Sequence, residues 1–286
     1  MRYGVSLWLW TSPVTTEVVE AYAPRVAELG FDTLELPLED PATLDVARAL
    51  KAIGAAGLDL TTCAAMGPGR DLVHPDPAVR DATMTYMRRC LECASALGAA
   101  KFVGPLYAEV GRLWQSSDAE RAEEHARLAD ALHALARRGE SLGVTICLEA
   151  LNRFESSFMN LTSQVVAMVE RVDHPHLKAM IDLFHAGIEE KNLGDAIRLA
   201  GPHLAHLQVA ENDRGTPGTG QLDWDGIAAA LAAIGYDSHV VIETFSPDNQ
   251  LLAKAAAIWR PLAESPDRLA ADGLEFLKAL TARPAR

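Results

Sequence analysis

The chain has 286 residues, of which 49% are hydrophobic and 23% are charged. This composition is typical of a folded globular protein and excludes a disordered, collagen-like or fibrous chain. With 26 basic and 39 acidic side chains the net charge is −13, which disfavours nucleic acid and anionic membrane surfaces as partners because the overall field repels them.

Neither a membrane segment nor an export signal is indicated. No apolar run reaches the ~18–20 residues that a membrane-spanning helix needs. The first residues, M-R-Y-G-V-S, lead directly into a strand-like pattern without the parts of a signal peptide. We therefore expect a cytoplasmic protein. Its four cysteines are too few for a disulfide framework and are predicted to be buried or half-buried thiols: Cys63, Cys90, Cys93 and Cys147.

Strand-like and helix-like segments alternate along the whole chain. Several strand-like segments, such as 144–148, are continuous apolar runs, which is typical of parallel strands covered on both faces. The expected strands are 3–10, 33–38, 58–64, 101–106, 144–150, 178–183, 205–210 and 239–245. The expected helices are 16–29, 41–55, 78–97, 118–142, 162–172, 194–200 and 224–234, followed by a C-terminal stretch 253–280.

Eight successive βα units predict an α/β fold, a single (β/α)₈ TIM barrel over residues 1–286 with a C-terminal helical extension. About 250 residues is the usual size of such a barrel, and no Pro/Gly/Ser-rich linker divides the chain. The main alternative is an open doubly wound sheet, which needs a glycine-rich turn after its first strand. Here W-L-W-T-S-P follows at 8–13, so the barrel is favoured.

Acidic residues end three of the expected strands: Glu149, Asp182 and Glu243. In a barrel the C-terminal strand ends build the active site, and buried carboxylates gathered there repel one another unless a cation lies among them. The seventh strand offers a neutral ligand on one face, either His206 or Gln208, and we prefer Gln208 because it lies nearer the strand end. This mostly oxygen-donor set predicts a site for Mn²⁺ or Mg²⁺.

A single acid at a strand end is more often a helix cap or an ion-pair partner. Four polar residues ending four successive strands favour the metal site over that interpretation. Large side chains after strands one, three and four are expected to wall the pocket, although aromatic residues at such places also occur as plain core. The residues predicted as walls are Trp8, Met66, Tyr107 and Trp114.

Four motifs carry a resemblance to a known family. They are C-L-E-A-L-N-R-F-E at 147–155, I-D-L-F-H-A-G-I-E-E at 181–190, E-N-D-R-G-T-P-G-T-G at 211–220 and V-I-E-T-F at 241–245. With them the chain resembles, over essentially its whole length, the D-tagatose, D-allulose and L-ribulose 3-epimerases, which are ketose 3-epimerases within the xylose-isomerase-like barrels. The resemblance implies a metal-dependent isomerase acting at C3 of a free ketose, with one Mn²⁺ (or Mg²⁺ or Co²⁺) per subunit of a homodimer or homotetramer.

The resemblance also implies roles for particular residues. Glu149 and Glu243 would bind the metal together with Asp182 and would be the two catalytic bases on opposite faces of the sugar. The carbonyl-end oxygens of the sugar would be held by three further side chains: Glu155, His185 and Arg214.

The chain departs from the family pattern at one ligand. The sugar epimerases usually read His-x-His before the Glu-x-Asn segment, with the second His as metal ligand, whereas this chain has Gln208 there. Glutamine at this place resembles the hydroxypyruvate isomerase branch, so a hydroxypyruvate-type isomerase or a keto-glycoside lyase is the first alternative. A metal-dependent DNA-repair endonuclease is disfavoured by the net charge, and a non-catalytic sugar-binding barrel by the intact Glu149 and Glu243.

Overall fold

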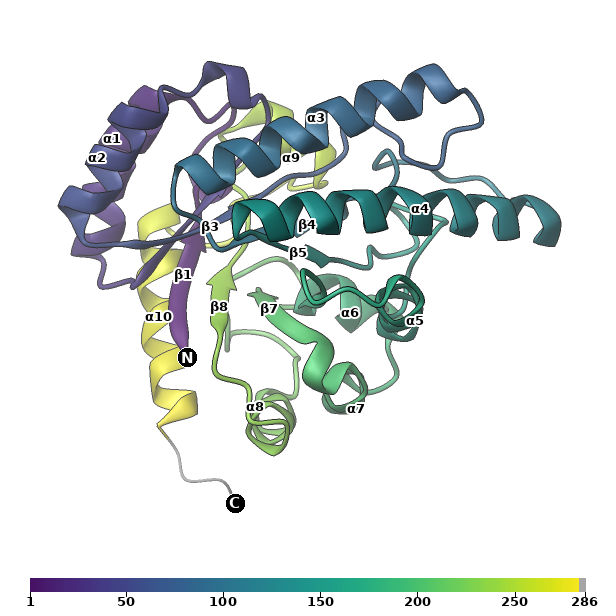
Figure 1. Cartoon of the computed structure of the whole chain (residues 1–286). Helices are drawn as coiled ribbons and strands as arrows, with labels where there is room; N and C mark the ends of the chain where they lie inside the picture. The colour runs from purple at the N-terminus through teal and green to yellow at the C-terminus, as the bar shows by residue number, and fades with distance from the viewer. Residues whose placement is uncertain (283–286) are drawn as a thin grey trace.

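The computed structural model describes residues 1–282, so the last residues of the predicted domain, 283–286, lie outside the described part. Eight parallel strands follow one another in sequence order and close into a barrel, with the last strand paired to the first (Figure 1). The strands are β1 (Arg2–Ser6), β2 (Thr33–Pro37), β3 (Asp59–Cys63), β4 (Lys101–Gly104), β5 (Thr145–Leu148), β6 (Leu177–Asp182), β7 (Leu204–Val209) and β8 (His239–Ile242). The predicted single (β/α)₈ barrel is confirmed, and its extent over 1–286 stays a prediction.

All eight expected strands form, and each ends earlier than predicted. The segment 3–10 leaves the sheet after Ser6, whose hydroxyl accepts a hydrogen bond from the Trp8 amide and starts a short 3-10 helix, Leu7–Leu9. Glu149 and Glu243 likewise stand just past the ends of β5 and β8, and each is still tied to a neighbouring strand by its backbone N–H. The two acids are therefore fixed by the barrel while their side chains stand at its rim.

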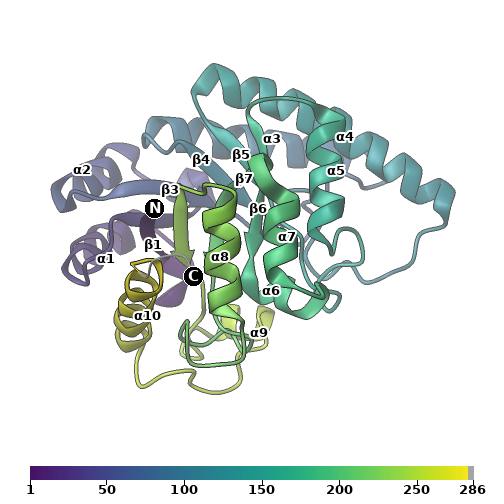
Figure 2. The same cartoon turned by 90° about the horizontal axis from the view of Figure 1, so that it is seen from below.

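Helices surround the barrel, as Figures 1 and 2 show from two directions. They are α1 (Thr16–Glu28), α2 (Val46–Ala56), α3 (Pro77–Ala96), α4 (Asp118–Leu142), α5 (Thr162–Val172), α6 (Leu183–Glu189), α7 (Leu193–Ala200), α8 (Trp224–Ala233), α9 (Gln250–Ala255) and α10 (Pro266–Thr281). The prediction did not include α6. This helix begins directly after β6 because the Asp182 carboxylate, at its N-cap, accepts from the Phe184 amide.

The helical stretch predicted at 253–280 is interrupted. It is formed by two helices, α9 and α10: α9 ends at Ala255, just before Ala257 with φ 54°, and Ser265 caps a new helix with Pro266 in its first turn. Helix α10 packs against α8 and β8, with Leu274 among its buried side chains (Figure 2). Helix α10 is thus the outer helix that follows β8, and α9 lies between β8 and α10 in the sequence.

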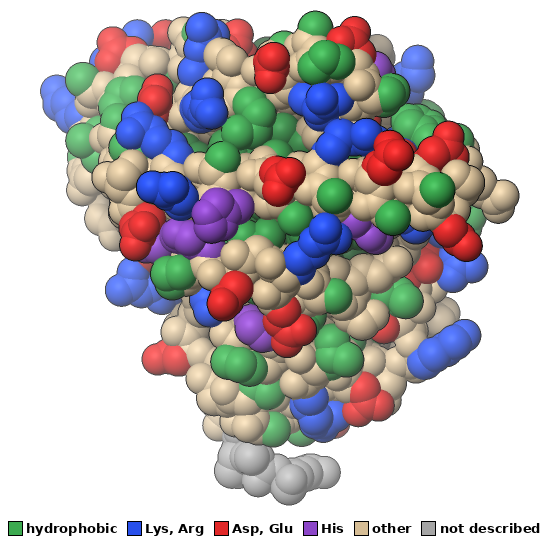
Figure 3. Space-filling view, turned by 45° about the vertical axis from the view of Figure 1, so that its right-hand side comes forward, with side chains coloured by type: hydrophobic (Ala, Val, Ile, Leu, Met, Phe, Trp, Pro, Cys, Tyr) green, Lys and Arg blue, Asp and Glu red, His purple; other side chains and the backbone are tan. Residues whose placement is uncertain are grey.

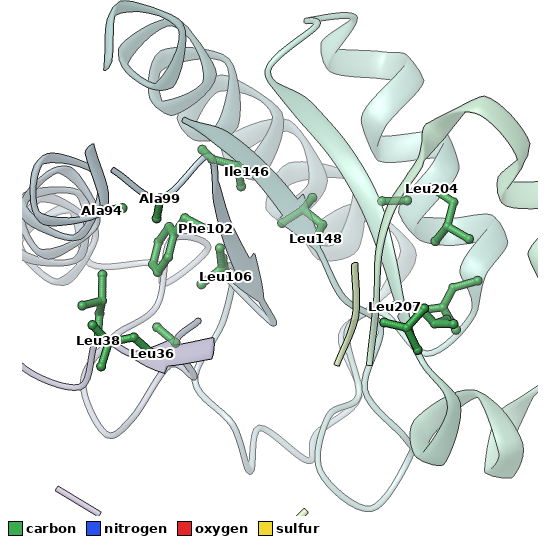
Figure 4. Packing of buried hydrophobic residues seen from close by; sticks show 14 of the residues in the cluster. Leu36, Leu38, Ala94, Ala99, Phe102, Leu106, Ile146, Leu148, Leu204 and Leu207 are labelled. Atoms are coloured by element: carbon green, nitrogen blue, oxygen red, sulfur yellow. The ribbon is translucent and has the colours of Figure 1, made fainter. Parts of the chain in front are cut away.

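The core lies both inside the barrel and between strands and helices, which explains the continuous apolar runs in the sequence. Phe102 of β4 is fully buried and lies near Leu36 and Ala94 in Figure 4. Gly104 ends β4 at φ +130°, and a Cβ there would stand 2.2 Å from the carbonyl oxygen of Ala64. Only glycine fits this close approach, and its own carbonyl accepts the Glu149 amide.

The surface and the cysteines agree with the expectations from composition. Lys and Arg side chains are interspersed with Asp and Glu on the face shown in Figure 3. Within residues 1–282, no helix combines the length and apolar character needed to cross a membrane. The four cysteines are free and buried, which confirms the prediction of buried thiols.

Candidate active site

The C-terminal ends of four neighbouring strands bring the predicted ligand residues together. Asp182 stands opposite Gln208 in the register of β6 and β7, with Glu149 and Glu243 at the ends of the flanking strands. All four side chains are buried, with at most 5% of each residue exposed. The Gln208 Nε2 donates to Glu243 Oε1 at 3.1 Å, so ligand candidates from β7 and β8 are in direct contact.

The three acids of this group bind protons more tightly than ordinary carboxyl groups. Burial, followed by repulsion from Asp182 and Glu243, raises the pKa of Glu149 well above its usual value. Burial also raises the pKa of Asp182, although the neighbouring Arg214 opposes the shift. For Glu243 burial outweighs the attraction of Arg214 and raises the pKa to about 8. Positive charge placed among these groups would favour their ionised forms.

Arg214 places its guanidinium among the acids. Its Nη1 donates to Asp182 Oδ2 at 2.6 Å and to Glu243 Oε2 at 3.1 Å. The residue has a left-handed backbone, φ 66°, in the loop after β7, where its amide donates to the Glu211 carbonyl and its own carbonyl accepts from the Thr244 hydroxyl. Burial by itself would lower the pKa of Arg214, but the carboxylates around it outweigh burial and raise it.

His185 places its imidazole ring beside the acids. Its Nδ1 lies 3.2 and 2.8 Å from the backbone and side-chain nitrogens of Asn152, and its Nε2 lies 2.9 Å from Arg214 Nη2, so both ring nitrogens face hydrogen-bond donors. That Nε2 lies 3.5 Å from both Glu149 Oε1 and Asp182 Oδ2. Burial, reinforced by the nearby Arg214, lowers the pKa of His185 well below its usual value, which keeps the ring neutral.

Asn152 is a site residue that the sequence reasoning did not single out. Besides its contacts to His185, its Nδ2 donates to Glu155 Oε1 at 2.9 Å, so one buried amide orients two predicted substrate-binding side chains. Its position within the N-R-F-E motif at 152–155 was the available signal.

Glu35 is the second residue that the sequence reasoning missed. It lies on β2, is completely buried, and accepts a hydrogen bond from Gln208 Nε2 at 2.7 Å. His206, the alternative ligand on β7, has its Nε2 2.9 Å from the other Glu35 oxygen and lies opposite Met180, deeper in the barrel than Gln208. An isolated acid in the apolar segment T-L-E-L-P at 33–37 was the signal for Glu35.

A cavity of about 110 Å³ opens beside these groups. Its polar side is formed by predicted site residues: Glu149, Glu155, His185, Arg214 and Glu243. Its apolar side includes residues after β1, β3, β4, β5 and β8 and from the region of helix α9: Trp8, Ala65, Pro105, Val110, Leu151, Phe245, Leu252, Ala255 and Ala256. Of the four predicted walls, Trp8 therefore lies where it was expected.

The other three predicted walls are not among the described residues that line this cavity. Met66 and Tyr107 are fully buried, and the Tyr107 ring packs 5.6 Å from the ring of Phe158. Trp114 is half-exposed, and the guanidinium of Arg112 lies 4.3 Å from the centroid of the Trp114 ring. Met66 and Tyr107 therefore belong to the buried core, and Trp114 belongs to the surface beside Arg112.

The residues present fit a divalent cation. Ligand atoms of Glu149, Asp182 and His185 lie within 4.8 Å of one another. His185 Nε2 also lies 2.9 Å from Arg214 Nη2, so this nitrogen already has a partner within the site. The buried Gln208 Oε1 has no hydrogen-bond partner within residues 1–282, and an unpaired oxygen beside raised-pKa carboxylates suits a hard cation.

Comparison with known proteins gives a consistent result. Residues 23–280 match the family model of the xylose isomerase-like TIM barrel. The chain is 31% identical to the ketose 3-epimerase of Arthrobacter globiformis over 97% of its length and 96% of that protein. It is 32% identical to the D-psicose 3-epimerase of Ruminiclostridium cellulolyticum, covering 93% of this chain and 92% of the relative.

Solved structures agree with the sequence matches. A structure of L-ribulose 3-epimerase superposes with a TM-score of 0.92 at 30% identity, covering 98% of this chain and 94% of the other. The predicted family and enzyme class are confirmed. The chain belongs to the ketose 3-epimerases of the xylose isomerase-like TIM barrels, a family of isomerase-class enzymes.

Proposed function

We propose that this protein epimerises a free ketose at C3 with the help of a bound divalent cation, Mn²⁺ in the first place and Mg²⁺ or Co²⁺ as substitutes. The observation that carries the proposal is one cavity lined by two buried carboxyl groups of raised pKa, Glu149 and Glu243, together with Arg214 and His185. The names of the relatives, which are ketose, D-psicose and L-ribulose 3-epimerases, support the same reaction.

Four residues would hold the cation: Glu149, Asp182, Gln208 and Glu243. When bound, the cation would act as a Lewis acid that makes the hydrogen next to the ketose carbonyl more acidic. Its charge would also lower the pKa of Glu149 and Glu243, so that one of them can be ionised as the proton acceptor while the other carries the proton that it delivers. The buried position of these acids supports this role, because a carboxylate removed from water is a stronger base.

Proton transfer is assigned to Glu149 and Glu243. One carboxylate removes the C3 hydrogen as a proton, and the electron pair of the C–H bond moves toward the carbonyl to give an enediolate. The other carboxylic acid then delivers a proton to C3 from the opposite face, which inverts the configuration. The acids stand on β5 and β8, two strands that are not neighbours, and this separation supports placing them on two faces of a sugar.

Three further side chains would hold the sugar oxygens. The guanidinium of Arg214 is a donor that suits the carbonyl-end oxygens as negative charge develops on them, and His185, whose Nε2 lies 2.9 Å from Arg214 Nη2, would complete this side of the pocket. Glu155, fixed by Asn152, is an acceptor that suits a hydroxyl group. Burial raises the pKa of Glu155, although Arg214 and Asn152 oppose the shift.

An unphosphorylated sugar fits the cavity best. Arg214 is the cation among the described residues that line it, and this guanidinium already contacts Asp182 and Glu243. The loop sequence G-T-P-G-T-G at 215–220 lacks the Gly-Lys-Ser/Thr ending of a phosphate-binding loop. The apolar wall of Trp8, Phe245 and Leu252 suits the C–H groups at the far end of a ketose.

The test is a substrate panel assayed with the chelator-treated protein and with the protein reloaded with Mn²⁺. D-fructose, D-tagatose, D-allulose and L-ribulose are incubated separately, and the C3 epimer is quantified by chromatography. Epimer formation that requires Mn²⁺ is expected for at least one ketose. Absence of any epimer from the reloaded protein would contradict the proposal.

A second candidate rests on Gln208, which replaces the histidine usual in the sugar epimerases. It is a hydroxypyruvate-type isomerase or a keto-glycoside lyase, which starts with the same proton abstraction next to a carbonyl. The same panel decides when hydroxypyruvate and a 3-keto-glycoside are added. Turnover of one of these, without turnover of any free ketose, would favour the second candidate.

We also propose a homodimer or homotetramer. Large apolar side chains with at least half of their surface exposed support it, since such groups are common in subunit contacts. They are Leu113, Trp114, Phe154, Leu199, Leu251 and Trp259. Light scattering coupled to size-exclusion chromatography measures the mass directly, and a mass of one chain would contradict this proposal.

A further inference from the structure

Glu35 connects the candidate metal site to the interior of the barrel. Its Oε1 accepts from Gln208 Nε2 at 2.7 Å, and its Oε2 accepts from the Thr61 hydroxyl at 3.1 Å. The His206 Nε2 lies 2.9 Å from the same Oε2. Glu35 is fully buried and is absent from the cavity lining, so whatever it does for the site it does through its neighbours.

The neighbours of Gln208 determine whether the nitrogen or the oxygen of its side-chain amide faces the carboxylates. Its Nε2 lies between two carboxylate oxygens, 2.7 Å from Glu35 Oε1 and 3.1 Å from Glu243 Oε1. If the side-chain amide were rotated by 180°, its oxygen would face both carboxylate oxygens, and the two hydrogen bonds that Nε2 donates would be lost. The nitrogen therefore belongs where it is, and the carbonyl oxygen is left free.

That free oxygen is the second observation. Gln208 Oε1 is buried and has no hydrogen-bond partner among the side chains and backbone groups of residues 1–282. A buried amide oxygen without a partner is rare in folded proteins and points to a ligand. Gln208 also stands opposite Asp182 in the register of β6 and β7, at the depth of the other candidate ligands.

Glu35 also faces His206, the other polar side chain of β7. The His206 Nε2 lies 2.9 Å from Glu35 Oε2, and the His206 ring stacks on His239 with 6.1 Å between the ring centroids, but within residues 1–282 neither ring nitrogen of His206 makes a hydrogen bond. The hydrogen bond that Glu35 accepts from β7 is therefore the one from Gln208 at the rim.

We infer that Glu35 is a positioning residue that fixes the Gln208 amide so that its Oε1 becomes the fourth ligand atom of the cation. This inference rests on the proposed metal site. It makes the ligand set all-oxygen, which favours Mn²⁺ and Mg²⁺ over softer ions such as Zn²⁺. Removing a residue that orients a metal ligand in this way commonly lowers metal affinity by roughly 10- to 100-fold.

The experiment measures Mn²⁺ and Zn²⁺ binding to chelator-treated protein by titration calorimetry, without any substrate. Glu35→Leu removes both acceptor oxygens, and we expect Mn²⁺ affinity to fall by about 10-fold or more, with a smaller loss for Zn²⁺. Glu35→Gln keeps one oxygen that can accept from Gln208 and should retain most of the Mn²⁺ affinity. Thr61→Val is the matched control, because it removes a hydrogen bond from the same carboxylate without touching Gln208.

A double mutant separates positioning from general destabilisation. In a Gln208→Leu background there is no amide to orient, so adding Glu35→Leu should cause no further loss of Mn²⁺ affinity. If Glu35→Leu does not fold, judged by circular dichroism, Glu35→Asp replaces it, because the shorter side chain withdraws its oxygen from Gln208 and should weaken Mn²⁺ binding in the same way.

The outcomes distinguish this inference from the proposed function. Folded Glu35→Leu or Glu35→Asp protein that binds Mn²⁺ as tightly as the wild type overturns the inference and leaves the proposed metal site standing. An equal loss from Glu35→Leu in the wild-type and Gln208→Leu backgrounds also overturns it, since Glu35 would then not act through Gln208. Wild-type protein that binds no divalent cation contradicts the proposed metal site itself.

Discussion

Arg214 Nη1 lies 2.6 Å from Asp182 Oδ2, and both side chains are buried at the centre of the candidate site. The same nitrogen lies 3.1 Å from Glu243 Oε2. The positive charge of one guanidinium thus offsets the negative charge of two of the three buried acids, Asp182 and Glu243. This relationship makes Arg214 important for the stability of the site as well as for substrate binding.

Replacing Arg214 by Gln should destabilise the metal-free protein. Removing one partner of a buried ion pair leaves an uncompensated charge and typically costs about 3–5 kcal/mol. Because a cation replaces part of the lost charge, Mn²⁺ should raise the melting temperature of the variant more than that of the wild type, as measured by calorimetry. The control is Arg260→Gln, which removes an exposed ion pair to Asp213 in the same loop and should cost about 1 kcal/mol or less.

Asn152→Ala should weaken substrate binding while sparing the metal. The variant loses the Nδ2 contacts to Glu155 Oε1 and His185 Nδ1, so two substrate-binding side chains lose their orientation. We expect KM for the ketose to rise by about 10-fold or more, corresponding to ~1.4 kcal/mol per factor of ten, with metal content unchanged by elemental analysis. Arg153→Ala, which removes an exposed side chain from the same loop, should change neither quantity. A loss of metal in Asn152→Ala would contradict this assignment.

The sequence predicted those site residues whose position follows from the residues next to them in the chain. Glu149, Asp182 and Glu243 were predictable because each follows an apolar strand, and the barrel topology brings strand ends together. The fold was predictable for the same reason, since eight strands alternate with helices in order. His185 and Arg214 followed from the motif resemblance rather than from periodicity.

The remaining site residues depended on contacts between distant parts of the chain. Asn152 acts through His185, which comes 33 positions later. Glu35 meets Gln208 across the barrel interior, 173 positions away. Met66 and Tyr107 were predicted as pocket walls because large side chains suit both a wall and a core, and only the direction of each side chain distinguishes the two.

Each catalytic base can be tested by itself with Glu243→Gln and Glu149→Gln. Each variant retains an oxygen that can bind metal but loses a proton acceptor, so epimer formation should fall by about 10²–10⁴-fold while metal content stays near that of the wild type. In a two-base mechanism the remaining carboxylate still serves one face. Each variant should therefore exchange the C3 hydrogen of one epimer with solvent, and the two variants should prefer opposite epimers.

Equal exchange of both epimers by each variant would point to one base that serves both faces. Full turnover of either variant would remove that residue from the mechanism altogether.

His239 should make stability depend on pH at the bottom of the barrel, away from the metal site. Its Nδ1 lies 2.8 Å from Lys101 Nζ and its Nε2 lies 2.9 Å from Asp59 Oδ2, with the His206 ring stacked beside it. Burial, followed by the charge of Lys101, lowers the pKa of His239 from 6.5 to about 4. Because the unfolded chain takes up this proton at the higher pH, stability is complete above pH 6.5 and falls as the pH decreases toward 4.

The loss should reach about 3 kcal/mol at most, as measured by urea unfolding at a series of pH values. His239→Gln, which cannot titrate, should flatten the curve between pH 6.5 and pH 4. An unchanged slope in this variant would show that other groups cause the acid sensitivity.

The central claim is reversible proton abstraction at C3 of a ketose, and hydrogen exchange with solvent measures it directly. The Mn²⁺-loaded protein is incubated with a ketose in D₂O, and deuterium at each carbon is followed by NMR. We predict that deuterium enters at C3 in both epimers at a rate that matches epimer formation, and that chelation of the metal stops both processes. Epimer formation without deuterium at C3, or deuterium at C1 alone, would contradict the account.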